Sequence, residues 1–236
     1  MKPKISLLEL EDLKITITYK AVKHLRLTVR PPAGETRVSA PLTMNPEIVK
    51  IFILSKLDWI QAQRQKLLSQ DRPAPLRYLD GEHHFFQGRR YLLRILEQPA
   101  PPKVNLAPDA LELYVRPSTP LENRRRLLEE WRRRQLKTAI ASLVAQYEPM
   151  MGVKVKEFGV KRMKTRWGTC NPSASRIWLN LELAQHPLPC LEYVVVHEMA
   201  HLLEPAHNQR FWRLLDQFYP QWRACREELN RLPLRN

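Results

Sequence analysis

The first half of the chain alternates between apolar and polar positions. From Leu13 to about residue 40 the period is two, and a Pro-Pro-Ala-Gly turn at residues 31–34 interrupts it. This pattern predicts three short antiparallel strands. A long helix is expected from about 46 to 69, because Asn45 is a good N-cap and Pro46 suits the first helical position. The apolar residues expected to pack one face of this helix on the sheet are Ile48, Ile51, Phe52, Leu57, Ile60, Leu67 and Leu68.

Further strands are predicted at 82–86, 90–96 and 110–115, each bounded by turn residues. Thr119, Pro120 and Glu122 then form a capping-box pattern, and the helix that they open is expected to end at Met151, before Gly152. At about 1.5 Å per residue this helix is long enough for a break inside it to be considered.

The last third changes from strands to helices. Strands are expected at 153–156, 160–170 and 177–179, the last two forming a hairpin, and helices at 189–203, 209–218 and after Pro220. No internal repeat is visible. The pattern predicts an α+β fold with a β-rich N-terminal region, residues 1–118, which contains the helix at about 46–69, and a second region at residues 119–236.

Composition limits the class of protein. The chain has 236 residues and a net charge of +15, from 39 Lys plus Arg against 24 Asp plus Glu. This charge attracts anions, although runs such as 124–126 and 132–134 are typical of a solvated helix face. Neither a membrane span nor a signal peptide is visible, so a cytoplasmic protein without a membrane partner is expected. Cys170, Cys190 and Cys225 are odd in number and far apart, which favours core positions.

The most specific signal is His197-Glu198-Met199-Ala200-His201 inside a predicted helix. A chance His-Glu-x-x-His is expected roughly 0.02 times in such a chain. Residues i and i+4 lie on one helix face, so both imidazoles can reach one metal, and Glu198 can lie beside a water on that metal. A catalytic zinc site needs one more protein ligand and an open fourth position.

The third ligand is assigned to His207, because Pro205 must interrupt the helix and let the chain turn back. Glu204, on the same helix face, is the rival, with Glu227 or Glu228 as remoter candidates. The other histidines are expected in surface or turn positions. These are His24, His83, His84 and His186.

With these residues the sequence resembles the YgjP-like metallopeptidase domain, which is related to SprT-like zinc proteases within the zincins. The resemblance covers nearly the whole chain except about 98–118, and Thr169 stands where the family usually has Ser. The segments that carry it are 19–23, 25–27, 56–60, 166–170, 177–180, 192–201, His207 and 211–212. The resemblance implies a zincin-like metallopeptidase core at 119–236, one zinc ion held by His197, His201 and His207, and Glu198 as general base.

The expected mechanism is hydrolysis, in which Glu198 takes a proton from a zinc-activated water that attacks a peptide carbonyl. Arg166 and Tyr193 are candidate donors to the developing oxyanion, and Asn180 is a candidate for orienting a ligand histidine. The aromatic residues near the motif are expected to be core. They are Trp167, Trp178, Phe211 and Trp212.

Two other functions compete with cleavage of a peptide or protein. The basic cluster at 161–166 and the net charge also suit a phosphorylated anionic small molecule, and thus a metal-dependent nucleotide pyrophosphatase or other phosphoanhydride hydrolase. The distant SprT-like similarity suggests a DNA-associated protease, although nucleic acid is indicated by charge alone. Three imidazoles also suit copper, nickel and iron, but the open site and the glutamate favour zinc.

Overall fold

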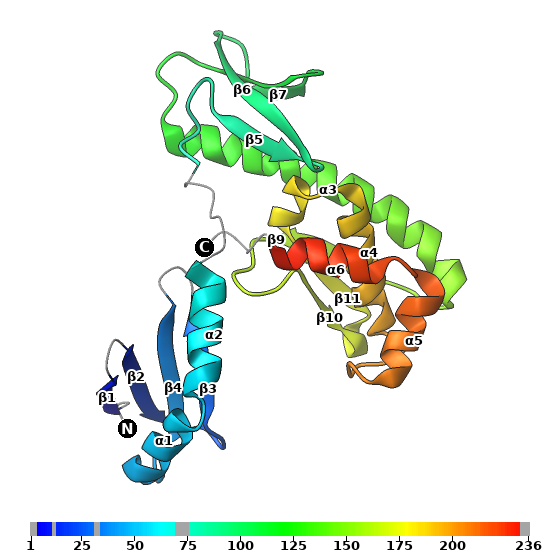
Figure 1. Ribbon diagram of the computed structural model, residues 1–236. Coiled ribbons are helices and arrows are strands. Elements are labelled where there is room, and N and C mark those ends of the chain that lie inside the picture. Colours follow the sequence, from blue (N-terminus) through cyan, green and yellow to red (C-terminus); the bar gives the residue numbers. More distant parts are fainter. Residues whose placement is uncertain (1–3, 11–12, 31–33, 69–75, 232–236) are drawn as a thin grey trace. The chain divides into compact units, whose positions relative to one another are not determined.

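The computed structural model describes residues 4–10, 13–30, 34–68 and 76–231 (Figure 1). The chain divides into two compact units, residues 1–72 and 73–235. The sequence had suggested a boundary after residue 118. The division falls earlier because strand residues such as Leu111 share one hydrophobic cluster with the helices that follow them, including Leu128.

The first unit contains a four-stranded sheet with the order β1-β2-β4-β3. Its strands are β1 (Lys4–Leu10), β2 (Leu13–Lys20), β3 (Arg26–Arg30) and β4 (Glu35–Pro41). Strand β1 was not predicted, and β2 pairs with β4 in parallel, so the prediction of three antiparallel strands is wrong for this pair. Alternation identifies strands but not their order in the sheet. Here β4 lies between β2 and β3, with β3 on its outer edge.

Two helices follow, α1 (Pro46–Leu54) and α2 (Leu57–Leu68), where one long helix was predicted. Asn45 caps the first as expected, since its Oδ1 accepts the Glu47 N–H at 2.9 Å. The break comes at Ser55, whose hydroxyl donates to the Phe52 carbonyl at 2.8 Å and so takes an acceptor within the last turn.

The face of α1 that is buried differs from the predicted one. Ile48 and Ile51 are 54% and 64% exposed, whereas Val49 and Ile53 are fully buried with the apolar residues of the sheet. Residues 49 and 53 are four apart and lie on one stripe, so the helix is rotated relative to the predicted stripe.

The second unit begins with another four-stranded sheet, with the order β5-β6-β8-β7. Its strands are β5 (His83–Phe86), β6 (Arg89–Glu97), β7 (Lys103–Leu106) and β8 (Ala110–Val115). Three of these were predicted and are confirmed, together with the turn at Gln87 and Gly88, where φ is positive. Strand β7 was missed although its residues alternate between polar and apolar, because the segment is only four residues long and lies between prolines.

Helix α3 (Leu121–Met151) is continuous over 31 residues and ends at Gly152, whose φ of 65° lies in the left-handed region. The predicted capping box is absent. Pro120 is the N-cap without a side-chain bond, and the Thr119 hydroxyl donates backwards to the Arg116 carbonyl at 2.6 Å. Arg132 in this helix is 3% exposed, so the run at 132–134 is not simply a solvated face.

A three-stranded sheet follows, with the order β10-β11-β9. Its strands are β9 (Glu157–Lys161), β10 (Gly168–Asn171) and β11 (Arg176–Asn180). Strands β10 and β11 form the predicted hairpin, joined through the 3₁₀ turn η1 (Pro172–Ala174), while β9 pairs with β11 in parallel. The predicted strand at 153–156 is irregular, and the predicted strand at 160–170 is two strands separated by a loop.

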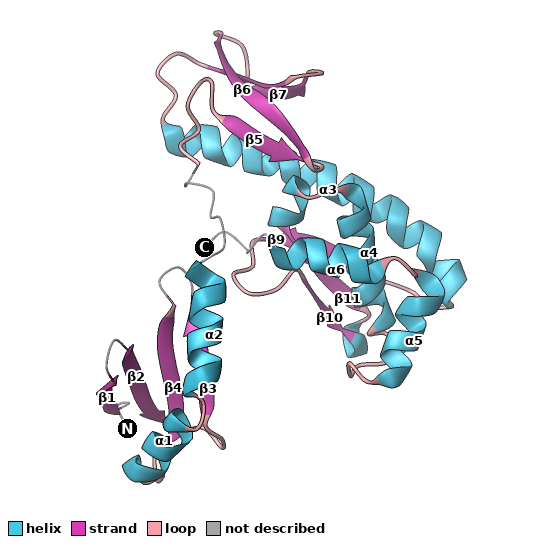
Figure 2. Cartoon of the chain, in the orientation of Figure 1, coloured by secondary structure: helices cyan, strands magenta, loops and turns pink. Residues whose placement is uncertain are grey.

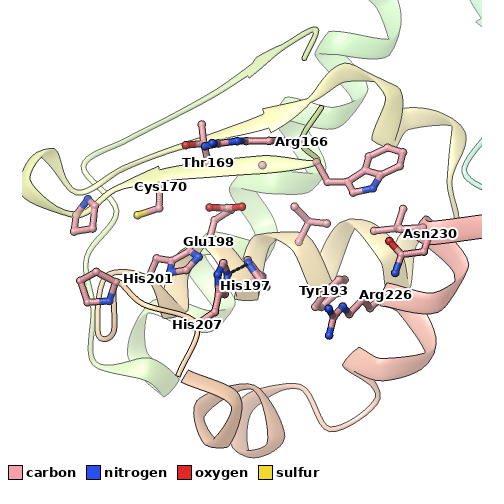
Figure 3. A pocket seen from close by; sticks show the side chains of 16 residues that line it. Arg166, Thr169, Cys170, Tyr193, His197, Glu198, His201, His207, Arg226 and Asn230 are labelled. Carbon is pink, nitrogen blue, oxygen red and sulfur yellow. Dashed lines mark hydrogen bonds between the residues drawn. The ribbon is translucent and has the colours of Figure 1, made fainter. Parts of the chain in front are cut away.

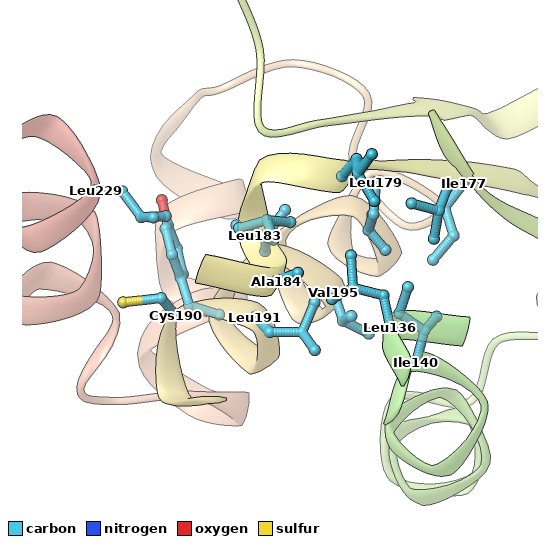
Figure 4. Packing of buried hydrophobic residues seen from close by; sticks show 14 of the residues in the cluster. Leu136, Ile140, Ile177, Leu179, Leu183, Ala184, Cys190, Leu191, Val195 and Leu229 are labelled. Carbon is cyan, nitrogen blue, oxygen red and sulfur yellow. The ribbon is translucent and has the colours of Figure 1, made fainter. Parts of the chain in front are cut away.

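The remaining helical elements of the second unit lie beside the three-stranded sheet and α3 (Figure 2). They are the 3₁₀ turn η2 (Leu181–Gln185), α4 (Leu188–Ala200), α5 (Gln209–Phe218) and α6 (Trp222–Arg231). Helix α4 packs against α3, α5, α6 and β10. Figure 4 shows Leu136 and Ile140 of α3 meeting Val195 of α4 and Ile177 of β11 in this core. Packing against these four elements fixes the position of α4, the helix that carries the His-Glu-x-x-His sequence.

The cysteines and the helices test two further expectations. Cys190 and Cys225 are buried, as predicted, whereas Cys170 is half-buried. None of the helices in the described part of the chain combines the length and the apolar character that a membrane span needs.

Candidate metal centre

The structure brings three histidines together. His197 lies in the last turn of α4 and His201 is the C-cap residue of this helix. The chain then turns at Pro205 and returns His207 to the same place. One nitrogen of each ring lies within 4.8 Å of those of the other two. The Nε2 atoms of His197 and His207 are 3.1 Å apart.

A buried phenyl ring supports all three imidazoles. Phe211 of α5 is fully buried, and its ring centre lies 4.9, 4.6 and 4.8 Å from those of His197, His201 and His207. The Trp212 ring stacks on that of His207, with 5.7 Å between the ring centres. The Asn208 side chain caps α5 through the Phe211 N–H at 3.1 Å and so helps to place this ring. The predicted core role of the two aromatic residues is therefore combined with positioning of the histidines.

Glu204 lies close to the centre but directs its carboxylate elsewhere. Its Oε1 accepts the Ala206 N–H at 3.3 Å, and Oε2 lies 3.9 Å from the Arg210 guanidinium. Its backbone carbonyl is 3.2 Å from His201 Nδ1. That contact places the ring hydrogen on Nδ1 and leaves Nε2 free to bind a metal. The geometry favours His207 over Glu204 as the third ligand.

Glu198 is 5% exposed and lies against strand β10. Burial raises its pKa to about 8, although the positive charge of Arg166 acts in the opposite direction. The close contact depends on Gly168, where a Cβ atom would lie 2.5 Å from Glu198 Oε1. The sequence analysis did not single out Gly168. Two features could have indicated it: the chain has only six glycines, and this one lies within the 166–170 segment that carries the family resemblance.

The charges of the imidazoles also suit a metal. Burial and the two neighbouring histidines lower the pKa of His197 to about 3, and burial lowers that of His201. Neutral rings offer the lone pairs that a metal requires. Ligand nitrogens on a tetrahedral zinc ion are separated by about 3.3 Å, close to the spacing found between His197 and His207. The donor set therefore fits one divalent metal ion.

The histidines and Glu198 line a cavity of about 600 Å³ (Figure 3). Strand β10 and the residues before it form one wall, and helices α4 and α6 form the other. The remaining lining residues are Arg166, Trp167, Gly168, Thr169, Cys170, Pro172, Tyr193, Val194, Pro205, Arg226, Leu229 and Asn230.

Arg166 and Tyr193, the two candidate donors, both line this cavity. Tyr193 is buried with its ring 5.7 Å from that of His197, and burial raises its pKa to about 12. Asn180 is fully buried outside the cavity lining and differs from its predicted role. Its Nδ2 donates to the carbonyls of Met163 and Arg166, both at 2.8 Å. It therefore holds the loop that carries Arg166, and no hydrogen bond to a histidine is found for it among the described residues.

The basic cluster at 161–166 does not converge on the cavity. Lys161 lies over the Trp178 ring at 5.0 Å, and Arg162 pairs with Glu129 at 2.9 Å and with Glu182 at 3.3 Å. Arg166 is the member of the cluster that lines the cavity.

Among the other histidines, His24 and His83 are exposed as predicted. His84 is fully buried, against the prediction, with Glu82 Oε2 2.9 Å from its Nε2 and an Arg132 nitrogen 3.3 Å from its Nδ1. Its neighbour His83 takes the outer face of β5, so the expected alternation holds but one ring points into the core. His186 is also buried, at the end of η2.

A buried glutamate beside three converging histidines, on a helix packed against a small sheet, defines a metallopeptidase-like fold and site. The chain matches the family model described as YgjP-like, metallopeptidase domain, over residues 23–232. It belongs to that family.

One solved structure that is similar to part of the chain is the crystal structure of the metallopeptidase zymogen of Pyrococcus abyssi abylysin. The match covers 38% of this chain and 90% of that chain, with 17% identity and a TM-score of 0.36. No curated protein matches the chain.

Proposed function

We propose that this protein is a zinc-dependent peptidase with Glu198 as general base and His197, His201 and His207 as metal ligands. The observation that carries the proposal is the convergence of three imidazoles within 4.8 Å, next to a buried carboxyl group and open to one cavity. Family membership supports peptide hydrolysis as the reaction.

Zinc bound there would supply a Lewis acid that polarises a carbonyl oxygen and acidifies a water. Glu198 accepts the proton from the attacking water and returns it to the leaving amine nitrogen, a task suited to a buried carboxyl group beside the three histidines. The Arg166 guanidinium stabilises the negative charge that develops on the carbonyl oxygen. Strand β10 is an outer strand of its sheet and lines the cavity, so its edge can pair with an extended peptide.

The test joins metal content with cleavage. Wild-type protein should hold one zinc ion per chain by mass spectrometry and cut an unfolded-peptide library. His207→Ala should lose most of the zinc, whereas Glu204→Gln should retain it. Glu198→Gln should keep the metal and lose activity by about a hundredfold or more.

Two outcomes would overturn the proposal. One is a zinc-loaded wild type that cuts no peptide and gives the same blank as Glu198→Gln. The other is zinc-dependent phosphate release from nucleotides that requires Glu198 while peptides stay intact, which would identify a phosphoanhydride hydrolase.

A further inference from the structure

One end of the cavity is formed by helix α6, away from Cys170 (Figure 3). Arg226 and Asn230 line this end, and both side chains are exposed. They are four residues apart on one helix and therefore lie on the same face. The proposed chemistry at Glu198 uses neither of them.

Aromatic rings hold the Arg226 side chain. Its guanidinium carbon lies 5.3 Å from the centre of the Trp212 ring and 5.9 Å from that of Trp222. These two indoles stack on each other at 5.0 Å with an angle of 19°. Such stacking restrains a guanidinium through its flat face and leaves the N–H groups at its edge available.

Arg226 also lacks a counter-ion in the described part of the chain. No carboxylate lies within 4 Å of it there, and no hydrogen bond from it is found. Arg223, one turn earlier on the same helix, pairs with Asp216 at 2.7 Å. Glu227 lines a second groove of about 280 Å³, which Arg223, Arg226 and Asn230 also border.

The charges around the cavity favour an anion. Among the described residues, the cavity lining contains two arginines, Arg166 and Arg226, and one carboxyl group, that of Glu198, which is 5% exposed. A carboxylate of the substrate would find a restrained guanidinium at the α6 end, with the Asn230 amide as a second donor. Guanidinium groups bind carboxylates through two parallel hydrogen bonds, which gives direction as well as affinity.

We infer that Arg226, assisted by Asn230, is a specificity-determining residue that binds a carboxylate of the peptide substrate. The inference rests on the proposed peptidase function, and it adds the chemistry that the site selects. The carboxylate belongs to an Asp or Glu side chain near the cleaved bond or to the C-terminus of the peptide.

Matched peptides separate these two sources. From one cleaved sequence, each position on both sides of the cleaved bond is changed between Glu and Gln, and the C-terminus between a free acid and an amide. At one of these positions, the wild type should cleave the peptide with the carboxylate with a kcat/KM about tenfold or more higher than that for the matched amide. Arg226→Ala should abolish this ratio, and Arg226→Glu should shift the preference towards Lys. Arg223→Ala, the matched control on the same helix, should leave the ratio unchanged.

Binding gives a second measurement that does not need turnover. In a Glu198→Gln background, the preferred acidic peptide should bind about tenfold more weakly after Arg226→Ala, measured by tryptophan fluorescence or calorimetry. Equal ratios in wild type and Arg226→Ala, with peptides still cut, would overturn the role of Arg226 and leave the peptidase intact. Cleavage of no peptide at all would instead count against the proposed function.

Discussion

The two four-stranded sheets of this protein have the same topology. In each, the first two strands pair antiparallel, the second and fourth pair in parallel, and the third returns to the outer edge of the fourth. Helical structure follows each sheet directly. The sequence shows no internal repeat, so different residues produce the same strand order.

The sheets differ in what they are packed against. Residues of the first form a small cluster with α1 and α2, such as Ile15 with Val49 and Ile53. Residues of the second share the large cluster with α3 and α4, and thus with the helix that carries His197 and His201. One sheet therefore belongs to a separate small unit, whereas the other shares its hydrophobic core with the helix of the candidate metal site.

The largest expected effect tests this difference with a matched pair of buried residues, Leu113 of β8 and Ile15 of β2, both fully buried. Leu113→Ala and Ile15→Ala should each lower the free energy of unfolding of their own unit by about 2–5 kcal/mol. Because zinc is proposed to bind the second unit, added zinc should raise the urea midpoint of the transition that Leu113→Ala shifts. Added zinc should not change the urea midpoint of the other transition, the one that Ile15→Ala shifts.

Unfolding in urea, followed by circular dichroism with and without zinc, makes this measurement. A single transition that responds equally to both substitutions and to zinc would break the comparison, because it would mean that the two units unfold together.

The part of the site that could be predicted is local in the sequence. Residues 197 and 201 share a face in any helix, and the ring of Pro205 prevents that helix from continuing to His207. Gly168 and Asn180 act through contacts between elements distant in sequence, with Glu198 and with the 163–166 loop. No periodicity reports such contacts.

The same distinction holds for the fold. Alternation located most strands, because strands such as β2 and β4 bury alternate residues, but strand order depends on which hairpin folds back on which neighbour. The buried position of His84 likewise depends on packing partners that the pattern does not identify, whereas the break of the predicted 46–69 helix at Ser55 comes with a local hydrogen bond that apolar spacing does not reveal.

The second prediction concerns a contact in the second unit between two residues that lie outside both four-stranded sheets, Gly168 and Glu198. Gly168→Ala places a Cβ atom 2.5 Å from Glu198 Oε1, so the carboxyl group must shift. Peptide turnover should fall by about tenfold or more while zinc content stays constant, since a displaced base transfers protons less efficiently. Gly152→Ala is the control: a Cβ atom there meets nothing within 4 Å, so it strains only the backbone, at about 1 kcal/mol. Unchanged turnover in Gly168→Ala would show that Glu198 tolerates the added methyl group.

The third prediction compares one acidic residue from each unit. Burial raises the pKa of Glu82, but the N–H groups of Arg77 and Tyr78 and the His84 ring outweigh it and hold the pKa below its ordinary value of 4.5. Glu82→Gln should lower the free energy of unfolding by about 1–2 kcal/mol at pH 7. Glu9 pairs with Lys14 at 3.4 Å on the surface. Glu9→Gln should therefore lower the free energy of unfolding by less than about 0.5 kcal/mol.

The pH dependence follows from the lowered pKa of Glu82. The stabilising contribution of its carboxylate is fully present above pH 4.5, the unfolded value, and is lost as the pH falls through the folded value. The difference in stability between wild type and Glu82→Gln should therefore shrink in acid, below about pH 4. Urea titrations at several pH values measure it, and a difference that grows in acid would contradict the assigned hydrogen bonds.

The smallest effects are expected where apolar side chains of the two units face solvent. Ile51 of α1 is 64% exposed and Leu121, at the start of α3, is 49% exposed, so replacing either with Lys should change the free energy of unfolding by less than about 0.5 kcal/mol. Ile53→Lys, two residues along α1 at a fully buried position, should instead prevent the first unit from folding, because the ammonium group would lose its hydration. Thermal unfolding of the three variants checks this. If Ile51→Lys destabilises as much as Ile53→Lys, the buried stripe of α1 includes residue 51, as the apolar spacing of the sequence had suggested, and the rotation of the helix would have to be revised.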